Sequence, residues 1–429
     1  MPGGSVIELT VERPVVGGRM IGRHDGRVVL VDGAIPGERI RAEVERARRD
    51  VVLARTVEVL EGSPDRRPAP GGPACGGRCF AHIAYRRQVQ LKSEIVRDAF
   101  RRIGRIDLAV PPPVVPSIEQ GYRMRARLHV GDSLVGFLEA GSHRVCDVSR
   151  LGPLLPKTER LIGAFATHAP ALGAVGARTV ELAEDLAGDQ CVLHVVVPGD
   201  AARARDALRP MASVAGVTGL TVGSTTNHAP LVLVGTPCVS DTLAAFLPSS
   251  RAETLSLRRH AAAFFQANRY LVPELVAAVA SQTARERVVD LYAGVGLFAV
   301  SIAALRGGSV TAVERDPCSA GDLVSNAAPL GPTVRVVRAP VETFLKRSAG
   351  LEGAAAIVDP PRTGLSREVV TRLARGQPDR IVSVSCDVAT QARDLRALLG
   401  AGYRIDQVHV FDMFPDTAHV ETVVSLERA

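Results

Sequence analysis

Cys386 and Glu421 are the residues best suited to covalent chemistry in this chain of 429 residues. Cys386 lies between the apolar stretch IVSVS and the helix-forming stretch ATQARDLRALLG, so we expect it between the end of a strand and the start of a helix. The dipole at a helix N-terminus favours the thiolate, which is the nucleophilic form. A lone cysteine is more often a small buried apolar residue, and that interpretation stays open.

Glu421 lies in the last apolar stretch, ETVVSLER, where a carboxylate is out of place unless it takes up a proton. We expect Glu421 and His419 to alternate along one strand, which would put both side chains on the same face. His419 is then a second candidate base, or a hydrogen-bonding support.

A glycine loop predicts a cofactor site. Asp290-Leu-Tyr-Ala-Gly294-Val-Gly296 follows an apolar stretch, and glycines let the backbone turn sharply and approach a ligand. Glu314 ends the next predicted strand, 20 residues after Gly294, where an acid can bind the hydroxyls of a ribose. The form G-x-G favours S-adenosylmethionine over a dinucleotide, and any Rossmann-like nucleotide loop stays an alternative.

Two further motifs belong beside this loop. Asp359-Pro360-Pro361-Arg362 ends another predicted strand, on the sheet edge where open α/β sheets bind ligands. The proline would hold the carboxylate at the cleft, and a plain proline turn is the alternative. The segment Phe264-Phe265-Gln266-Ala267-Asn268 combines aromatic rings with amides, which can stack on and hydrogen-bond to a base or a cofactor.

The elements that must position these residues fall into four parts. Residues 1–62 contain short alternating strands broken by Gly and Pro, which predicts an OB-like β-barrel. Residues 63–120 hold a cysteine segment, a basic helix and a proline linker, and residues 121–255 predict a central α+β domain that binds RNA. Residues 256–429 alternate strand, turn and helix, which predicts a Rossmann-like doubly wound α/β domain.

Positive charge is concentrated in one segment. The net charge is +7, and residues 75–127 hold eleven Arg and Lys against four acids, a difference of +7. Such a block predicts contact with a polyanion such as RNA, and a solvated helix face is the alternative. In the helix predicted over residues 85–104, Lys92 and the arginines fall mostly away from the apolar stripe, whose members are Val89, Ile95, Val96, Ala99, Phe100 and Ile103.

Cysteine usage and hydropathy predict the compartment. The seven cysteines are scattered, and their odd number argues against a disulfide framework and for a reducing cytoplasm. No apolar run of about 18 residues predicts a membrane span, and the first residues lack the pattern of a secretory signal. We therefore expect a cytoplasmic protein, with a monomer as the default state.

Five motifs resemble, in this order, those of the bacterial uracil-C5 RNA methyltransferases, which form 5-methyluridine in tRNA and rRNA: FFQAN, DLYAGVG, DPPR, SCDVATQARDL and FDMFPDTAHVE. The likeness covers nearly the whole chain, and the N-terminal stretch GRVVLVDGAIPGERI resembles a TRAM domain. The resemblance implies Cys386 as nucleophile and Glu421 as base. It also implies an S-adenosylmethionine pocket formed, beside Gly294 and Gly296, by Gln266, Tyr292, Glu314 and Asp359. From the same motifs we expect substrate contacts at Phe265, Arg362 and Phe411.

The reaction that the resemblance implies needs one thiol and one carboxylate and no metal. The thiolate adds to C6 of uracil, C5 takes the methyl group, and a base removes the C5 proton so that the thiolate can leave. The target base must leave its stack to reach such a site.

The sequence departs from the family at a metal centre. Many members carry a [4Fe–4S] cluster on four cysteines, and here the matching run is reduced to Cys75 and Cys79. The upstream position falls in residues 67–72 and the downstream one near Leu151. Because four thiolates are the usual requirement, we expect no intact cluster. A rearranged site on Cys75, Cys79 and Cys146 is the alternative.

Two other functions stay open at this point. An RNA-binding protein with an inactive methyltransferase domain fits the loss of cluster cysteines, although the presence of Cys386, Asp359 and Glu421 argues against it. A small-molecule or cytosine methyltransferase is the third possibility. Leu297 and Pro340 replace more polar residues of the family and could weaken cofactor binding. The sequence does not identify the RNA or the uridine.

Overall fold

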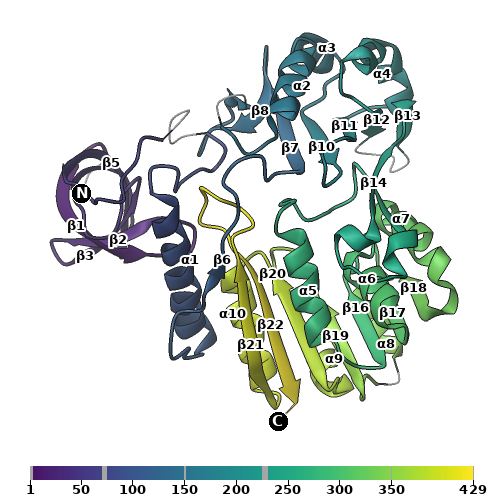
Figure 1. Ribbon diagram of the computed structural model, residues 1–429. Helices are drawn as coiled ribbons and strands as arrows, with labels where there is room; N and C mark the ends of the chain where they lie inside the picture. Colours follow the sequence, from purple (N-terminus) through teal and green to yellow (C-terminus); the bar gives the residue numbers. More distant parts are fainter. Residues whose placement is uncertain (1–2, 70–74, 149–150, 225–229, 349, 429) are drawn as a thin grey trace.

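The N-terminal part of the computed structural model is a closed barrel (Figure 1). The structure describes residues 3–69, 75–148, 151–224, 230–348 and 350–428. The barrel strands pair in the order β1-β2-β3-β5-β4, with alternate residues buried. Their bounds are β1 (Val6–Pro14), β2 (Met20–His24), β3 (Arg27–Asp32), β4 (Arg39–Ala47) and β5 (Val51–Glu61). The predicted OB-like barrel is confirmed.

One helix leads from the barrel to the rest of the chain. α1 (Tyr85–Ala99) continues as a π-helical turn, Phe100–Gly104. Its buried face includes the predicted Ile95 and Val96, but Ile103 is 37% exposed. The prediction that Lys92 lies away from the apolar stripe is wrong, because its side chain is fully buried against a carboxylate partner.

The central part is a mixed sheet covered by helices. Its seven strands have the order β13-β12-β11-β10-β7-β8-β9, and β11 and β12 form the one parallel pair among the described pairings. The strands are β7 (Arg125–Val130), β8 (Val135–Leu138), β9 (Val145–Asp147), β10 (Thr179–Glu184), β11 (Cys191–Val197), β12 (Gly219–Ser224) and β13 (Leu231–Gly235). The helices are α2 (Pro156–Ala166), α3 (Ala169–Ala174) and α4 (Ala201–Leu208). A hairpin of β14 (Cys238–Thr242) and β15 (Ser256–His260) follows.

The C-terminal part is an eight-stranded sheet in the order β18-β17-β16-β19-β20-β22-β21-β6. Its strands are β6 (Val114–Val115), β16 (Arg287–Leu291), β17 (Ser309–Glu314), β18 (Val334–Arg338), β19 (Ala354–Val358), β20 (Arg380–Ser385), β21 (Tyr403–Phe411) and β22 (Glu421–Arg428). β22 is antiparallel to both of its neighbours. The predicted Rossmann-like sheet is confirmed, whereas the sequence analysis did not predict β21 or the edge strand β6.

Helices cover both faces of this sheet, because alternate strand residues point to opposite sides. Val288 and Val310 pack in one core with residues of α5 (Val272–Gln282), α6 (Leu297–Arg306) and α7 (Pro317–Ala327). Val289 and Leu291 pack in another core that joins the barrel, α1, α8 (Val341–Arg347), α9 (Arg367–Gly376) and α10 (Val388–Leu399). No helix in the described part of the chain is long and apolar enough to cross a membrane.

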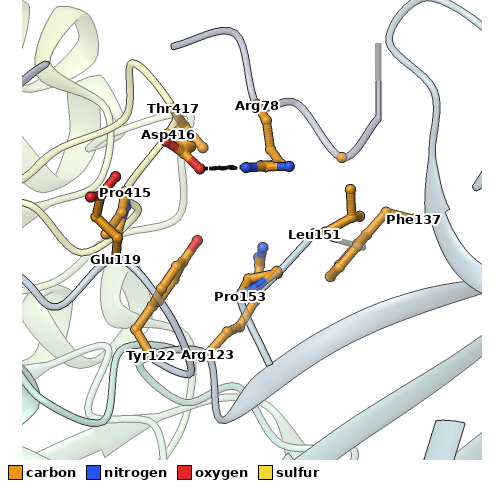
Figure 2. A pocket seen from close by; sticks show the side chains of 11 residues that line it. Arg78, Glu119, Tyr122, Arg123, Phe137, Leu151, Pro153, Pro415, Asp416 and Thr417 are labelled. Carbon is orange, nitrogen blue, oxygen red and sulfur yellow. Dashed lines mark hydrogen bonds and ion pairs between the residues drawn. The ribbon is translucent and has the colours of Figure 1, made fainter. Parts of the chain in front are cut away.

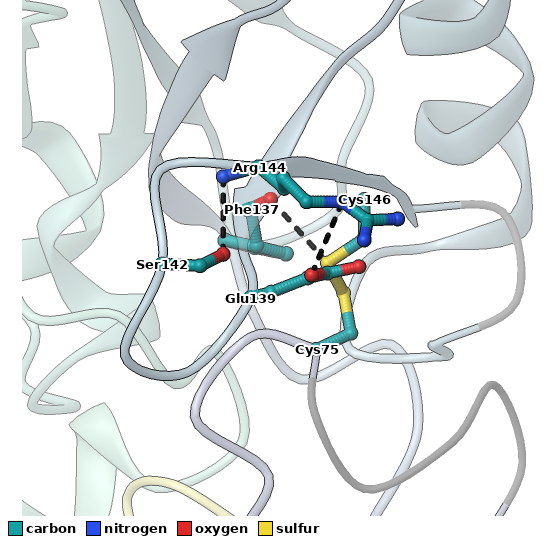
Figure 3. Close-up of a disulfide and its surroundings, with 6 residues drawn as sticks. All are labelled: Cys75, Phe137, Glu139, Ser142, Arg144 and Cys146. Atoms are coloured by element: carbon teal, nitrogen blue, oxygen red, sulfur yellow. Dashed lines mark hydrogen bonds and ion pairs between the residues drawn. A yellow bond between two sulfur atoms is a disulfide. The ribbon is translucent and has the colours of Figure 1, made fainter.

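A disulfide joins the segment before α1 to the central sheet (Figure 3). Cys75 forms an isolated bridge with Glu139 beside β8, and this brings its sulfur to Cys146 on β9. The scattered cysteines argued against a disulfide framework, and the sequence analysis did not predict this one bond, since a separation of 71 residues carries no sequence signal. Cys79 is free and packs in a different core.

The alternative of a rearranged metal site on these three cysteines is not formed. Two of the three thiols are bonded to each other. Within the described ranges no group of three or more His, Cys, Asp or Glu side chains is placed to hold a metal ion. Residues 70–72 of the predicted upstream cluster position lie outside the described residues.

Candidate active site

Cys386 and Glu421 lie side by side at one edge of the C-terminal sheet. β20 and β22 are antiparallel, and Ser385 is paired with Thr422. Cys386 and Glu421 are each one residue further along, so they face each other just beyond that pair. The hydroxyl of Thr422 bonds to the Ser385 carbonyl at 3.1 Å and to Gln391 Oε1 at 2.5 Å, which ties this edge to α10.

The thiol of Cys386 is half-buried, and its surroundings raise its pKa. Burial raises its pKa to about 12, the negative charges of Glu421 and Asp359 act in the same direction, and Arg362 opposes them by charge and a hydrogen bond. This shift opposes the helix dipole, which the sequence analysis expects to favour the thiolate. Asp387 caps α10 by accepting a hydrogen bond from the Thr390 N–H at 2.8 Å, so a carboxylate already occupies part of the helix N-terminus.

Carboxylates run in a row from Glu421 to the glycine loop. Burial raises the pKa of Glu421 well above its usual value, and the charge of Asp359 adds to the effect. Burial likewise raises the pKa of Asp359. Asp290 is fully buried on β16, and its pKa is raised by burial and then by Asp359 and Glu314. Arg362 is the cation that lowers the pKa of Glu421.

The glycine loop has the backbone that its sequence predicts. Tyr292, Gly294 and Gly296 have φ values of 66°, 56° and 96°. The Gly294 N–H donates to Glu314 Oε2 at 2.9 Å, so Glu314 lies against the loop. A Cβ on Gly296 would stand 2.6 Å from a methyl of Leu323, which explains the glycine.

Asp290 is a site residue that the sequence analysis did not single out. Its Oδ2 accepts a hydrogen bond from the Ala299 N–H at 3.0 Å and so fixes the start of α6. Its Oδ1 is buried and has no partner among the described residues. Position alone could have suggested it, because it directly precedes the glycine loop at the end of a strand.

The FFQAN segment points its two rings in opposite directions. Phe265 is buried under the guanidinium of Arg259, at 4.2 Å, and packs edge-on against Phe246. Phe264 is 60% exposed, with Arg125 at 5.5 Å from its ring. The predicted substrate contact at Phe265 is inconsistent with this burial, and Phe264 offers the open face instead. Adjacent residues of an extended segment face opposite ways, and the sequence could not tell which one is outside.

The other predicted site residues also include both buried and exposed side chains. Gln266 is buried beside Phe265. Phe411 is the last residue of β21 and is buried in the core, which is inconsistent with the predicted substrate contact. Arg362 is exposed and reaches Cys386. His419 lies in the loop before β22 and not on the strand, with its ring edge-on to Phe414, so it does not alternate with Glu421 as predicted.

The carboxylates of the site suit a cationic cofactor. Four carboxylates (Asp290, Glu314, Asp359 and Glu421) stand at neighbouring strand ends, and an orphaned buried oxygen lies among them. A sulfonium and an ammonium group would relieve their mutual repulsion. S-adenosylmethionine carries both groups, and the residues present therefore fit it.

Much of the basic block forms ion pairs within the chain, although several of its cations share one carboxylate, as Arg101 and Arg102 share Asp98. Seven of its eleven cations pair with carboxylates. Over the described ranges, those without an ion pair are Arg86, Arg97, Arg105 and Arg123. The guanidinium of Arg123 lies between the rings of Phe137 and Phe414, at 5.3 and 5.7 Å, and lines a pocket beside the Arg78–Asp416 pair (Figure 2).

Comparisons with known proteins agree with this geometry. Residues 350–429 match the family described as tRNA (uracil-5-)-methyltransferase, and residues 3–57 match the TRAM domain. A solved structure, the tRNA (uracil-54, C5)-methyltransferase of Pyrococcus abyssi in complex with S-adenosyl-L-homocysteine, has a TM-score of 0.72 and 24% identity, covering 97% of this chain and 99% of that one. At that identity it shows the shared fold.

Curated relatives match along almost their whole length. A 23S rRNA (uracil(1939)-C(5))-methyltransferase of Methylococcus capsulatus is 33% identical, covering 96% of this chain and 94% of that protein. The protein of the same description from Alkalilimnicola ehrlichii is also 33% identical, with the same coverage. An uncharacterized RNA methyltransferase of Thermosynechococcus vestitus is 31% identical over 99% of this chain. The chain belongs to the RNA uracil-C5 methyltransferase family.

Proposed function

We propose that this enzyme uses S-adenosylmethionine to form 5-methyluridine in RNA, and that its substrate is 23S rRNA. The two relatives at 33% identity, both described as 23S rRNA methyltransferases, support the choice of rRNA. tRNA, the substrate in the description of the solved neighbour, is the second candidate. Both RNAs occur in the cytoplasm, where we place the enzyme as a monomer.

The observation that carries the proposal is the placement of Cys386 opposite Glu421 beyond the Ser385–Thr422 pair. The sulfur of Cys386 adds to C6 of the target uracil, and the displaced electrons make C5 nucleophilic. S-adenosylmethionine, when bound, supplies the electrophilic methyl group that C5 takes. Glu421 then accepts the C5 proton, the ring double bond forms again, and the carbon–sulfur bond breaks to release Cys386.

The positively charged groups of the site favour the ionised forms of Cys386 and Glu421 that the reaction needs. The thiol must lose its proton before it attacks, and Arg362 is the chain's own cation that favours the thiolate. The same guanidinium lowers the pKa of Glu421, which must be ionised to act as a base. A cationic cofactor next to these groups shifts both equilibria in the same direction. The exposed ring of Phe264 is a stacking surface for a base of the RNA.

Methyl transfer from labelled S-adenosylmethionine to unmodified 23S rRNA fragments and tRNA transcripts tests the proposal. We expect transfer to a uridine of the rRNA. Binding of RNA without any transfer would favour the alternative of an inactive methyltransferase domain.

RNA that contains 5-fluorouridine tests the mechanism. Because fluorine cannot leave as a proton does, the covalent enzyme–RNA adduct should persist in the wild type and be absent in Cys386→Ala. Cys238→Ala, a half-buried cysteine on β14, is the matched control and should form the adduct. On ordinary RNA, Glu421→Gln should accumulate an adduct, and normal turnover of that variant would refute the assignment of the base.

A further inference from the structure

The loop of residues 412–420, which leads from β21 into Glu421, is held at its start by α1. Lys92 forms an ion pair with Asp412, and its Nζ also donates to the Phe414 carbonyl at 2.9 Å. Both side chains of the pair are fully buried. The Asp412 N–H donates to the Val115 carbonyl on β6 at 2.9 Å. Figure 1 shows α1 and β6 running alongside this end of the sheet.

The middle of the loop is held by a second residue of the same helix. Gln88 Nε2 donates to Asp416 Oδ1 at 2.9 Å, and Gln88 Oε1 accepts from the Asp416 N–H at 2.9 Å. Arg67 and Arg78 reach the carboxylate of Asp416 at 2.8 and 2.7 Å, and Figure 2 shows the Arg78 contact. Asp416 has a φ of 65°, in the left-handed region that aspartate adopts more readily than most residues with a side chain.

A third attachment joins the loop to the cofactor side of the site. Asn268, the last residue of FFQAN, donates from Nδ2 to the Met413 carbonyl at 3.2 Å and to Ser117 Oγ at 2.8 Å. The loop therefore has fixed points at positions 412, 413, 414 and 416, all before the chain reaches Glu421. Glu421 is itself paired with Phe411 of β21, the residue directly before Asp412, and Thr422 is paired with Ser385 of β20. The contacts that hold Asp412 therefore also hold the end of β21 that lies against Glu421.

The buried ion pair between Lys92 and Asp412 argues for a role in positioning the loop rather than in stabilising the fold. Removing two charges from water costs about as much as their attraction returns, so well-packed apolar residues would serve equally well for stability. What apolar residues cannot supply is the directed contact of one ammonium group with both the Asp412 carboxylate and the Phe414 carbonyl. Such contacts select one arrangement of the loop backbone.

We propose that Lys92 and Gln88 are positioning residues for the general base. Through Asp412, Phe414 and Asp416 they set the path of the 412–420 loop and thereby the place of the Glu421 carboxylate at the target C5. The proposal rests on the function proposed above. Both side chains are fully buried in α1, so the role assigned to them in proton removal acts through the loop.

Single-turnover kinetics of Lys92→Met and Gln88→Met on ordinary substrate RNA test this. A displaced Glu421 slows removal of the C5 proton and leaves addition of the thiol and methyl transfer nearly intact. We expect the methylated covalent adduct, seen as a shifted band on a denaturing gel, to accumulate at least tenfold over the wild type. The Kd for S-adenosylmethionine should change less than threefold.

Matched controls separate positioning from general damage. Gln90→Met changes an exposed glutamine of the same helix, and Lys346→Met changes an exposed lysine of α8. In both variants the covalent adduct should break down to methylated RNA and free enzyme as fast as in the wild type. The double variant Lys92→Met/Asp412→Leu removes both buried charges and should recover thermal stability while adduct still accumulates.

The results of these experiments separate failure of the positioning role from failure of the proposed function. If the wild type transfers no methyl group to RNA, the proposed function fails and this inference fails with it. If the wild type is active and the Lys92 and Gln88 variants lose stability with no rise in adduct, the positioning role is refuted and the function stands. Joint recovery of stability and adduct resolution in the double variant would also refute it.

Discussion

The reactivity of the Cys386 thiol gives a direct test of the electrostatics of the site. A pKa of about 12, against an ordinary value of 9.0, means that the thiolate fraction at pH 7.5 is lower by about 1,000-fold than for a free cysteine. The more basic thiolate is intrinsically more nucleophilic, by about 20-fold for three pKa units. We therefore expect ligand-free enzyme to react with a small aromatic disulfide about 50-fold more slowly at Cys386 than a model thiol does.

The assay follows modification of the Cys386 peptide by mass spectrometry as a function of pH. The rate should rise about tenfold for each pH unit between 7 and 10, because the thiolate fraction does. Glu421→Gln removes one of the charges that raise the pKa, and each unit by which the pKa falls should speed the reaction by about threefold at pH 7.5. Glu368→Gln, an exposed change on α9, should leave the rate unchanged. A Cys386 that reacts as fast as the model thiol, or a rate independent of pH, would refute the reasoning.

Three further predictions concern stability and can be measured by thermal and chemical denaturation. Burial raises the pKa values of Asp290, Asp359 and Glu421 in the folded state, so the stabilisation that they contribute is complete below about pH 4, the ordinary pKa of a carboxyl group, and is lost as pH rises through the folded values, about 7 for Asp359; their contribution to the free energy of unfolding should fall over that range, and S-adenosylmethionine should stabilise the enzyme more at pH 8 than at pH 5. Gly296→Ala should lower the free energy of unfolding by about 1–3 kcal/mol, because of its φ of 96° and the contact with Leu323, whereas Gly163→Ala on the open face of α2 should not be destabilising. Reduction of the Cys75–Cys146 disulfide should remove up to about 4 kcal/mol by freeing a loop of 71 residues in the unfolded chain, and an unchanged melting temperature with reductant would contradict the presence of that bond.

The sequence alone determined the architecture and the order of the chemical groups. Alternation along the strands and glycine-rich turns are local properties of the chain, and they predicted the barrel, the Rossmann-like sheet and the glycine loop that Glu314 contacts. Cys386 could be placed at a strand end for the same reason. These predictions depend on neighbours a few residues apart, which is the range over which backbone propensity and side-chain periodicity act.

Only the tertiary structure decided what surrounds those groups. The pKa of the Cys386 thiol is raised by burial and then by the charges of Glu421 and Asp359, and Lys92 is buried because a loop about 320 residues later supplies Asp412 and the Phe414 carbonyl. The Cys75–Cys146 disulfide and the outward face of Phe264 have the same origin. A pKa, an ion pair and the exposed side of a ring depend on the sum of long-range contacts, and no local pattern in the chain encodes that sum.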